Sequence, residues 1–378
     1  MNKYIVSKKH KTANYIGASV VTAAVLLTTP IMLSAETVLP NVEVETDKTI
    51  NYSETYKVDK SSSSKVTQDL VDTPQTISVI TKKVMEEQKA TTLQEALRNT
   101  PGITLLLGEQ GNTDAKNNIS MRGFDVNSSI YKDGIKNLNA ATNDMFNTEA
   151  VEVTKGTVGA DNGSSVASGY INQISKFATN KDAGEVSASY GTAQNTRLTA
   201  DLNKALSETL GVRLNVMKQD GEVAGRDEVE IDRMGIAGAV SFGIGTNIRT
   251  SINYERYEQD DVPDGGIPVI GLDTYYNTGW TRASNGTTSY NASTAALANG
   301  AKVDSSNFYG TADDYEKVTT DVFTGKIEHD FNDKTSLTNT LRYGKSKIDS
   351  LLTQSATISA NNSTNPSDWK IGRASCRE

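Results

Sequence analysis

The chain has 378 residues, with 38 lysines and arginines against 46 aspartates and glutamates, so its net charge is −8. This acidic balance excludes a broadly basic nucleic-acid-binding surface. One cysteine and two histidines, His10 and His329, exclude a disulfide framework, a histidine metal cluster and a histidine-based catalytic triad. No nucleophile–base pair or phosphate-binding loop is visible in the sequence, so we expect no enzyme, no cofactor and no resident metal ion.

Residues 1–35 are expected to be a secretory signal peptide. Four lysines precede an apolar run from Ile16 to Leu33, and a small-residue cleavage pattern ends at Ala35. The alternative is a transmembrane anchor, but the run is short and is interrupted by threonines and by Pro30.

The next segment, residues 36–65, is polar and has no apolar periodicity. Its composition predicts a flexible tail that ends in the serine-rich linker 61–64. Within the tail, Val42, Glu43, Val44, Glu45 and Thr46 alternate like a short strand with nothing to pair with. Such a segment can add itself to the sheet edge of another protein.

Residues 66–179 mix helical and strand patterns and predict a small α+β domain. A strand is expected over 76–80. Thr92 and Glu95 form a capping-box pattern that begins a helix, and Pro101 ends it. Further short strands, each bounded by Gly, Asp or Asn, are expected within residues 118–124, 129–134, 150–154 and 169–175.

From residue 180 to residue 370 the helical signals mostly vanish and alternating segments of up to about ten residues begin. We expect seven such strands, within residues 185–190, 196–203, 211–218, 234–242, 247–255, 320–329 and 336–343. Tight turns alternate with longer polar connections, which is typical of a transmembrane antiparallel β-barrel; a soluble β-sandwich is the alternative. Tyr254, Tyr257 and Tyr343 are expected in an aromatic girdle.

Residues 371–378 have a separate origin in our interpretation. They can be encoded by a sequence that looks like a common short-read sequencing adapter read in frame. We therefore expect an artefact, with the natural protein continuing past about Lys370 and with Cys376 not native.

Several separate motifs then resemble one family in their order along the chain. Residues 72–80, 93–103, 119–125, 131–134, 151–156 and 169–176 resemble the plug domain of TonB-dependent siderophore receptors. Residues 161–169 and 262–268 look closest to the catecholate-receptor branch. Thr157 and the pair Ala160–Asp161 depart from the usual turn residues of the family. The resemblance implies an α+β plug domain followed by a barrel of about 22 strands, of which roughly a third is present here.

The resemblance also implies a function and partners. The protein would lie in the outer membrane of a Gram-negative-type bacterium and import a ferric siderophore, with a catecholate as the favoured ligand. Energy would come from the periplasmic TonB protein and its inner-membrane motor complex, which would hold residues 42–46 as the TonB box. Outer-membrane lipids are the other expected partner, and nucleic acid is not one. The alternatives are another cargo (cobalamin, another metal chelate or an oligosaccharide) and a surface adhesin barrel without transport.

Ligand contacts are expected at the two outer apices of the plug. By their order along the motifs, the candidates are Gln110, Asn112, Lys116 and Asn143. A ferric catecholate carries strong negative charge, whereas these apices are rich in acids, which shifts recognition toward the long outer loops.

Two basic residues are assigned to plug packing or gating, not to ligand binding. Arg122 is expected in a buried plug strand, where its charge needs a partner: a barrel glutamate, Glu95 or Glu152. Lys155 is interpreted in the same way.

Overall fold

The computed structural model describes residues 52–106, 118–137, 144–158, 167–267, 280–282, 288–290, 304–332, 334–359 and 370–377. The expected signal peptide and most of the expected tail lie outside these residues.

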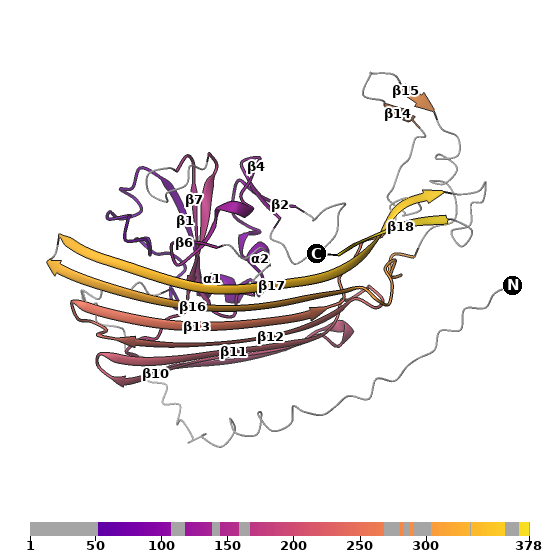
Figure 1. Cartoon of the computed structure of the whole chain (residues 1–378). Coiled ribbons are helices and arrows are strands. Elements are labelled where there is room, and N and C mark those ends of the chain that lie inside the picture. Colours follow the sequence, from indigo (N-terminus) through magenta and orange to yellow (C-terminus); the bar gives the residue numbers. More distant parts are fainter. Residues whose placement is uncertain are drawn as a thin grey trace, which may run out of the picture. The chain divides into compact units, whose positions relative to one another are not determined.

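The α+β domain over residues 66–179, which we call the plug after the family it resembles, contains two small sheets (Figure 1). The five-stranded sheet has the order β1 (Thr76–Thr81), β7 (Thr148–Lys155), β8 (Gly169–Ser175), β5 (Ile130–Lys132) and β6 (Ile135–Lys136). It is antiparallel except where β5 runs parallel to β8. The three-stranded sheet consists of β2 (Ile103–Leu105), β3 (Ile119–Met121) and β4 (Phe124–Asp125), and the short turn η3 (Asn127–Ser129) follows it.

The helix predicted after Thr92 is confirmed as α2 (Leu93–Leu97). The Thr92 hydroxyl accepts a hydrogen bond from the Glu95 backbone N–H, and the Glu95 carboxylate accepts one from the Thr92 backbone N–H, which is the predicted capping box. A second helix, α1 (Lys82–Glu87), was not predicted. It spans fewer than two turns, so it offers little hydrophobic periodicity to recognise.

The core of the plug is apolar and fully enclosed. Leu93, Leu97, Ile119 and Ile171 have no exposed surface and pack in one cluster from both sheets and from α2. This burial is the main favourable term that holds the small domain together.

The strands after the plug form one continuous antiparallel sheet (Figure 1). Its order is β9 (Ala183–Tyr190), β10 (Thr196–Ser207), β11 (Leu210–Glu222), β12 (Glu230–Phe242), β13 (Ile248–Asp261), β16 (Tyr315–Asn332), β17 (Thr335–Ser359) and β18 (Lys370–Arg377). All seven predicted strands are confirmed, and most are longer than predicted, because alternation continues into polar segments. The short turn η4 (Thr192–Gln194) and the hairpin β14 (Trp280–Arg282) and β15 (Thr288–Tyr290) lie in the connections.

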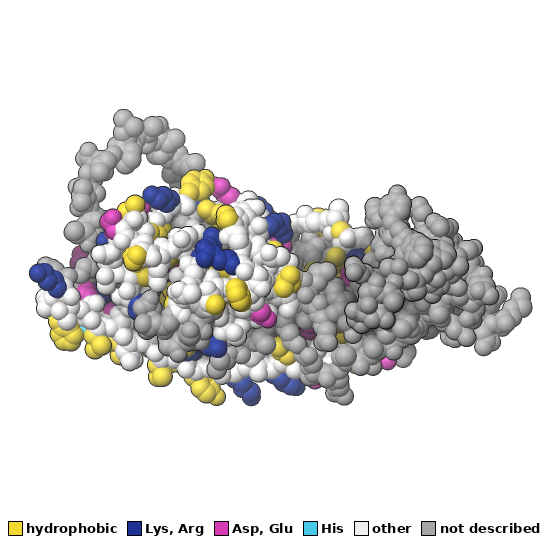
Figure 2. All heavy atoms as spheres, turned by 90° about the horizontal axis from the view of Figure 1, so that it is seen from above, with side chains coloured by type: hydrophobic (Ala, Val, Ile, Leu, Met, Phe, Trp, Pro, Cys, Tyr) yellow, Lys and Arg dark blue, Asp and Glu magenta, His cyan; other side chains and the backbone are white. Residues whose placement is uncertain are grey.

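The two faces of this sheet differ in chemistry. Large apolar side chains are exposed on one face, among them Val186, Leu341 and Tyr343, which are 74%, 69% and 72% exposed. Figure 2 shows hydrophobic side chains along the lower edge of the surface, as seen from above. The opposite face is polar and carries buried side chains such as Asn215 and Glu255. A hydrophobic outer face and a polar inner face are the pattern of a membrane β-barrel wall.

One girdle assignment is wrong. Tyr254 and Tyr343 are exposed, but Tyr257 is only 2% exposed and packs with Phe146 of the plug. Tyr254 and Tyr257 are three residues apart on β13, and side chains an odd number of positions apart point to opposite faces of a strand.

The expected linker also differs from the prediction over residues 52–65. Tyr52 and Val58 are 6% and 9% exposed and pack with Ala150 of β7. This segment lies on the plug because it contains two apolar anchors between its polar residues, and a flexible linker has none.

Within the described residues, no helix combines the length and the apolar composition needed to cross a membrane.

Candidate functional site: the charged interface between plug and barrel wall

Charged side chains of the plug meet opposite charges on the polar face of the barrel sheet in three clusters. Each cluster is largely shielded from solvent. A buried charge is costly unless it is paired and hydrogen-bonded, so these clusters determine how the plug is seated.

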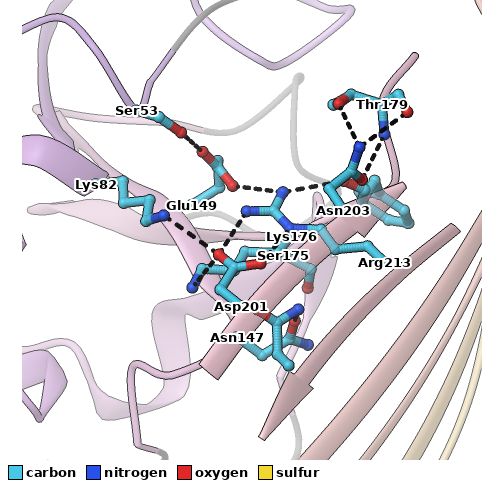
Figure 3. A network of polar contacts seen from close by, with 12 residues as sticks. Ser53, Lys82, Asn147, Glu149, Ser175, Lys176, Thr179, Asp201, Asn203 and Arg213 are labelled. Carbon is cyan, nitrogen blue, oxygen red and sulfur yellow. Dashed lines mark hydrogen bonds and ion pairs between the residues drawn. The ribbon is translucent and has the colours of Figure 1, made fainter. Parts of the chain in front are cut away.

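The first cluster is centred on Asp201 of β10 (Figure 3). The carboxylate of Asp201 lies 2.9 Å from Lys176 Nζ and 3.2 Å from Lys82 Nζ of the plug. Arg213 of β11 donates two hydrogen bonds of 2.8 Å to the same carboxylate. Three cations therefore surround one barrel aspartate.

The two plug lysines of this cluster respond differently to their surroundings. Burial alone would lower the pKa of Lys82, but Asp201 and Glu86 outweigh it, and the pKa is raised. Lys176 is more deeply buried, and burial lowers its pKa although Asp201 opposes the shift. Lys82 also contacts Glu185 of β9 at 3.0 Å, so it is well supplied with counter-charges.

Glu149 of β7 extends the first cluster toward the N-terminal side of the plug (Figure 3). Its Oε2 atom lies 2.9 Å from Arg213 Nη1, and its Oε1 atom accepts a 2.7 Å hydrogen bond from the Ser53 hydroxyl. The contact with Arg213 is a close ion pair without hydrogen-bond geometry, because Oε2 accepts no hydrogen bond within the described residues.

The second cluster joins β5 to β13 and β17. Lys132 Nζ lies 2.6 Å from Glu255 Oε2, and the two side chains are 7% and 5% exposed. Asn147 donates a further 2.6 Å hydrogen bond to Glu255. Arg342 of β17 donates to Asp133 Oδ2 and to the Lys132 carbonyl oxygen, both at 2.7 Å.

The third cluster is a bidentate ion pair between β10 and the plug. Arg197 of β10 donates two hydrogen bonds of 2.7 Å to Asp144 of the plug. Beside it, the Phe146 ring occupies the space over Gly235 of β12, where a Cβ atom would come within 2.6 Å of the ring. Because Gly235 has no side chain, the Phe146 ring of the plug can pack directly against β12.

Local structure explains why these residues face each other. On the barrel side, the polar residues recur two positions apart, as in Asp201 and Asn203 or Asn253 and Glu255, so they share one face of their strands. On the plug side, Lys132 ends β5 and Asp133 occupies a tight turn with φ 52°. Strand ends and turns are where a compact domain can present charges without disturbing its core.

The predicted site residues are only partly described. The TonB box residues 42–46 and the candidate ligand residues Gln110, Asn112, Lys116 and Asn143 lie outside the described residues, so these assignments stay predictions.

The expected burial of Arg122 is wrong. Arg122 is exposed, because it occupies the two-residue turn between β3 and β4 with φ 52° and its side chain points outward. Its expected partners accept hydrogen bonds from other residues: Glu95 from Thr92, and Glu152 from the backbone N–H of Ser62.

Lys155 ends β7 and is half-buried. Burial lowers its pKa, and the nearby positive charge of Arg122 lowers it further. The two residues assigned to gating are therefore neighbours of like charge, and their gating role stays a prediction.

The sequence interpretation missed the residues that actually connect plug and wall. Lys132 lies inside the motif Tyr131–Gly134, and Glu255 ends the segment predicted as a strand. One signal in the sequence could have identified Glu255. The alternation of its strand places this charged side chain on the inner face, where a buried charge needs a partner of opposite sign.

No group of three or more His, Cys, Asp or Glu side chains within the described parts of the chain is arranged to hold a metal ion. The three clusters hold the plug and the barrel sheet together through ion pairs and hydrogen bonds.

Residues 69–170 match the family model of the TonB-dependent receptor plug domain. The match covers both plug sheets as far as the beginning of β8.

Two relatives match further along the chain. The catecholate siderophore receptor Fiu of Escherichia coli K12 is 43% identical over 299 residues, which are 79% of this chain and 38% of that protein. The probable TonB-dependent siderophore receptor PiuA of Acinetobacter baumannii is 36% identical over 328 residues, which are 86% of this chain and 41% of that protein.

The solved structures agree with these relatives. The closed form of the ferric-catecholate import receptor Fiu from Escherichia coli K12 matches with a TM-score of 0.75 and 41% identity, over 85% of this chain and 44% of that one. The crystal structure of PiuA from Acinetobacter baumannii matches with a TM-score of 0.68 and 37% identity, over 80% and 41%. The chain thus spans about two fifths of the length of the curated relatives it matches.

Proposed function

Because the chain carries the plug domain and the first barrel strands of the TonB-dependent siderophore receptors, we propose that it belongs to an outer-membrane importer of a ferric siderophore. The catecholate class is the favoured ligand, since the chain is similar to a catecholate siderophore receptor over 79% of its length.

The observation that carries this proposal is the plug seated on the barrel wall. The buried pairs Lys132–Glu255 and Arg197–Asp144 join a folded domain to the polar face of a sheet whose other face is apolar. A plug held in this way blocks a wide pore until it is moved. Such a device fits a rare cargo that is too large for an open porin.

Movement of the plug needs energy at the outer membrane, where there is no ATP. We propose that the TonB protein and its inner-membrane motor complex pull residues 42–46 as an added strand. The segment precedes Tyr52, the first described residue, by only a few residues, and Tyr52 packs against Ala150 of the plug, so tension on the segment would reach the plug.

The test uses the full-length protein in cells that lack their other siderophore receptors. We expect energised uptake of iron-55 bound to a catecholate siderophore, and loss of uptake with retained binding when residues 42–46 are deleted. Deletion of a similar length within residues 36–41 is the matched control and should leave uptake intact. Equal loss of binding and uptake would contradict the TonB-box assignment.

A second cargo is tested in the same cells. Unlabelled ferric hydroxamate and cobalamin should fail to compete with the labelled ferric catecholate. Strong competition by either would move the assignment to that cargo. Absence of any energised uptake would favour the non-transporting barrel.

A further inference from the structure

Residues 52–62, which we call the tail strap, lie between the proposed TonB box and the plug. Tyr52 and Val58 are buried against Ala150. Between these anchors, the Tyr56 hydroxyl donates a 2.6 Å hydrogen bond to Glu87 of α1, and Lys83 Nζ lies 4.3 Å from the centroid of the Tyr56 ring. The strap is therefore fastened to both β7 and α1.

The strap supplies hydrogen bonds to two carboxylates of β7, the partly buried Glu149 and the buried Glu152. At its start, the Ser53 hydroxyl donates a hydrogen bond of 2.7 Å to Glu149 Oε1. At its end, two hydrogen bonds reach Glu152: one of 2.6 Å from the Ser62 backbone N–H to Oε1, and one of 2.9 Å from the Ser61 hydroxyl to Oε2.

Glu152 is unusual because it is 2% exposed and no ion pair with it is found among the described residues. Burial raises its pKa, and the donors from Ser62, Ser61 and Asn172 offset only part of that effect. If these donors are removed, the burial of the Glu152 carboxylate is no longer compensated by hydrogen bonds and becomes strongly unfavourable.

Glu149 connects the strap to the barrel wall. Its second oxygen faces Arg213 of β11 at 2.9 Å, and Arg213 in turn holds Asp201, to which Lys82 and Lys176 are bound (Figure 3). A change at Ser53 therefore reaches the charge cluster that seats the plug through one side chain.

We propose that the tail strap is a release latch, and that its removal from Glu149 and Glu152 is the first mechanical step of transport. This inference rests on the proposed function, because it assumes tension on the tail. Tension from residues 42–46 would peel Ser53 from Glu149 first, and would then strip Ser61 and Ser62 from Glu152. The two carboxylates lose their donors and draw in water, which weakens the Glu149–Arg213 contact between plug and wall.

The main experiment staples the strap in place in the full-length protein. Tyr56→Cys and Glu87→Cys would be joined by a short bis-maleimide that contains a reducible disulfide. We expect the stapled protein to bind the ferric catecholate with unchanged affinity but to lose at least tenfold in uptake rate, with recovery after reduction of the linker.

The matched control places the same linker between Lys57→Cys and Asp59→Cys. Both side chains are exposed, at 86% and 76%, and both lie within the strap, so this linker leaves release free. Uptake should match the unstapled protein. Unchanged uptake with the Tyr56–Glu87 staple would overturn the latch, whereas absent uptake without any staple would overturn the proposed function instead.

A second measurement follows the strap itself. Val58 is 9% exposed, so Val58→Cys should resist a polar maleimide in resting cells and react several-fold faster in cells that are transporting ligand. A protonophore should abolish the increase, and Asp59→Cys should react in both conditions. An inert Val58→Cys during active uptake would contradict strap release.

Discussion

At the scale of single residues, the interface depends on where each ion pair lies. Lys132 and Glu255, 2.6 Å apart, are both buried, whereas Lys317 and Asp260, 2.9 Å apart, are 55% and 57% exposed. Removal of one partner of a buried pair leaves an uncompensated charge, and the same change at the surface leaves a hydrated one.

Lys132→Met should therefore destabilise the seated plug by about 3–5 kcal/mol. Lys317→Met is the matched control and should cost about 0–1 kcal/mol. Thermal unfolding and protease resistance of the detergent-solubilised full-length protein measure both. Similar losses for the two variants would mean that the Lys132–Glu255 pair is not shielded as the structure shows.

Glu152 makes the plug sensitive to pH. Burial raises the pKa of this carboxyl above its unfolded value, so the folded plug binds the proton more tightly than the unfolded chain. Its contribution to stability is present below the unfolded pKa and is lost as pH rises through the folded pKa.

Glu152→Gln removes this titration. We expect the midpoint of thermal unfolding of the variant, relative to the wild type, to rise progressively as pH increases from about 4, near the ordinary pKa of a glutamate, toward neutrality. A difference that is constant across this range would show that Glu152 does not titrate there.

Residue roles were the least predictable part of the molecule from sequence. Arg122 was expected to be buried because its segment was predicted to be a buried plug strand, but a tight turn carries it outward. Lys132 lies in a similar context and is buried at the wall. Gly123 was a local signal for the turn that exposes Arg122, whereas the partner of Lys132 lies more than a hundred residues away and leaves no local signal.

At the scale of elements, the strands were well predicted, because each alternates between two faces that differ strongly in polarity. The capping box identified α2 for an equally local reason. Helix α1 was missed since its six residues make too short a pattern. The strap was misjudged because Tyr52 and Val58 are isolated anchors in a polar segment.

The contact between β12 and the plug gives a prediction at this scale. Gly235→Val should displace the Phe146 ring and destabilise the seated plug by about 1–3 kcal/mol, since a Cβ there would lie 2.6 Å from the ring. Gly238→Val on the same strand is the control, because its Cβ meets nothing within 4 Å.

The rate at which a protease cleaves the plug and the midpoint of thermal unfolding both measure this destabilisation. The second change Phe146→Ala should partly restore the Gly235→Val variant. No recovery would mean that the valine acts through β12 itself.

At the scale of the whole molecule, the order of plug and barrel strands followed from the sequence together with the family resemblance. The assignments of the outer apices and of the ligand contacts lie outside the described residues and stay predictions, and the sequence is a weak guide there because polar loop residues look alike whether they bind a ligand or water.

The two faces of the barrel wall give the last prediction. Leu341 is exposed on the apolar face, so Leu341→Arg in the full-length protein should cost up to about 2–4 kcal/mol, depending on its depth in the bilayer, and should reduce the folded yield in the outer membrane. Thr340→Arg is the neighbouring control on the polar face and should be better tolerated. Heat-modifiable migration of the membrane fraction on gels reports both, and equal yields would contradict the assignment of the faces.

The charges on the wall are of both signs, with Asp201 and Glu255 among the acids and Arg197, Arg213 and Arg342 among the bases. Each meets its opposite on the plug, so a plug rotated about the barrel axis would bring like charges together. These pairs therefore fix the plug against rotation on this part of the wall. In the importer that we propose, the plug would have to leave its seat by translation or by unfolding, and the polar face left behind would be open to water.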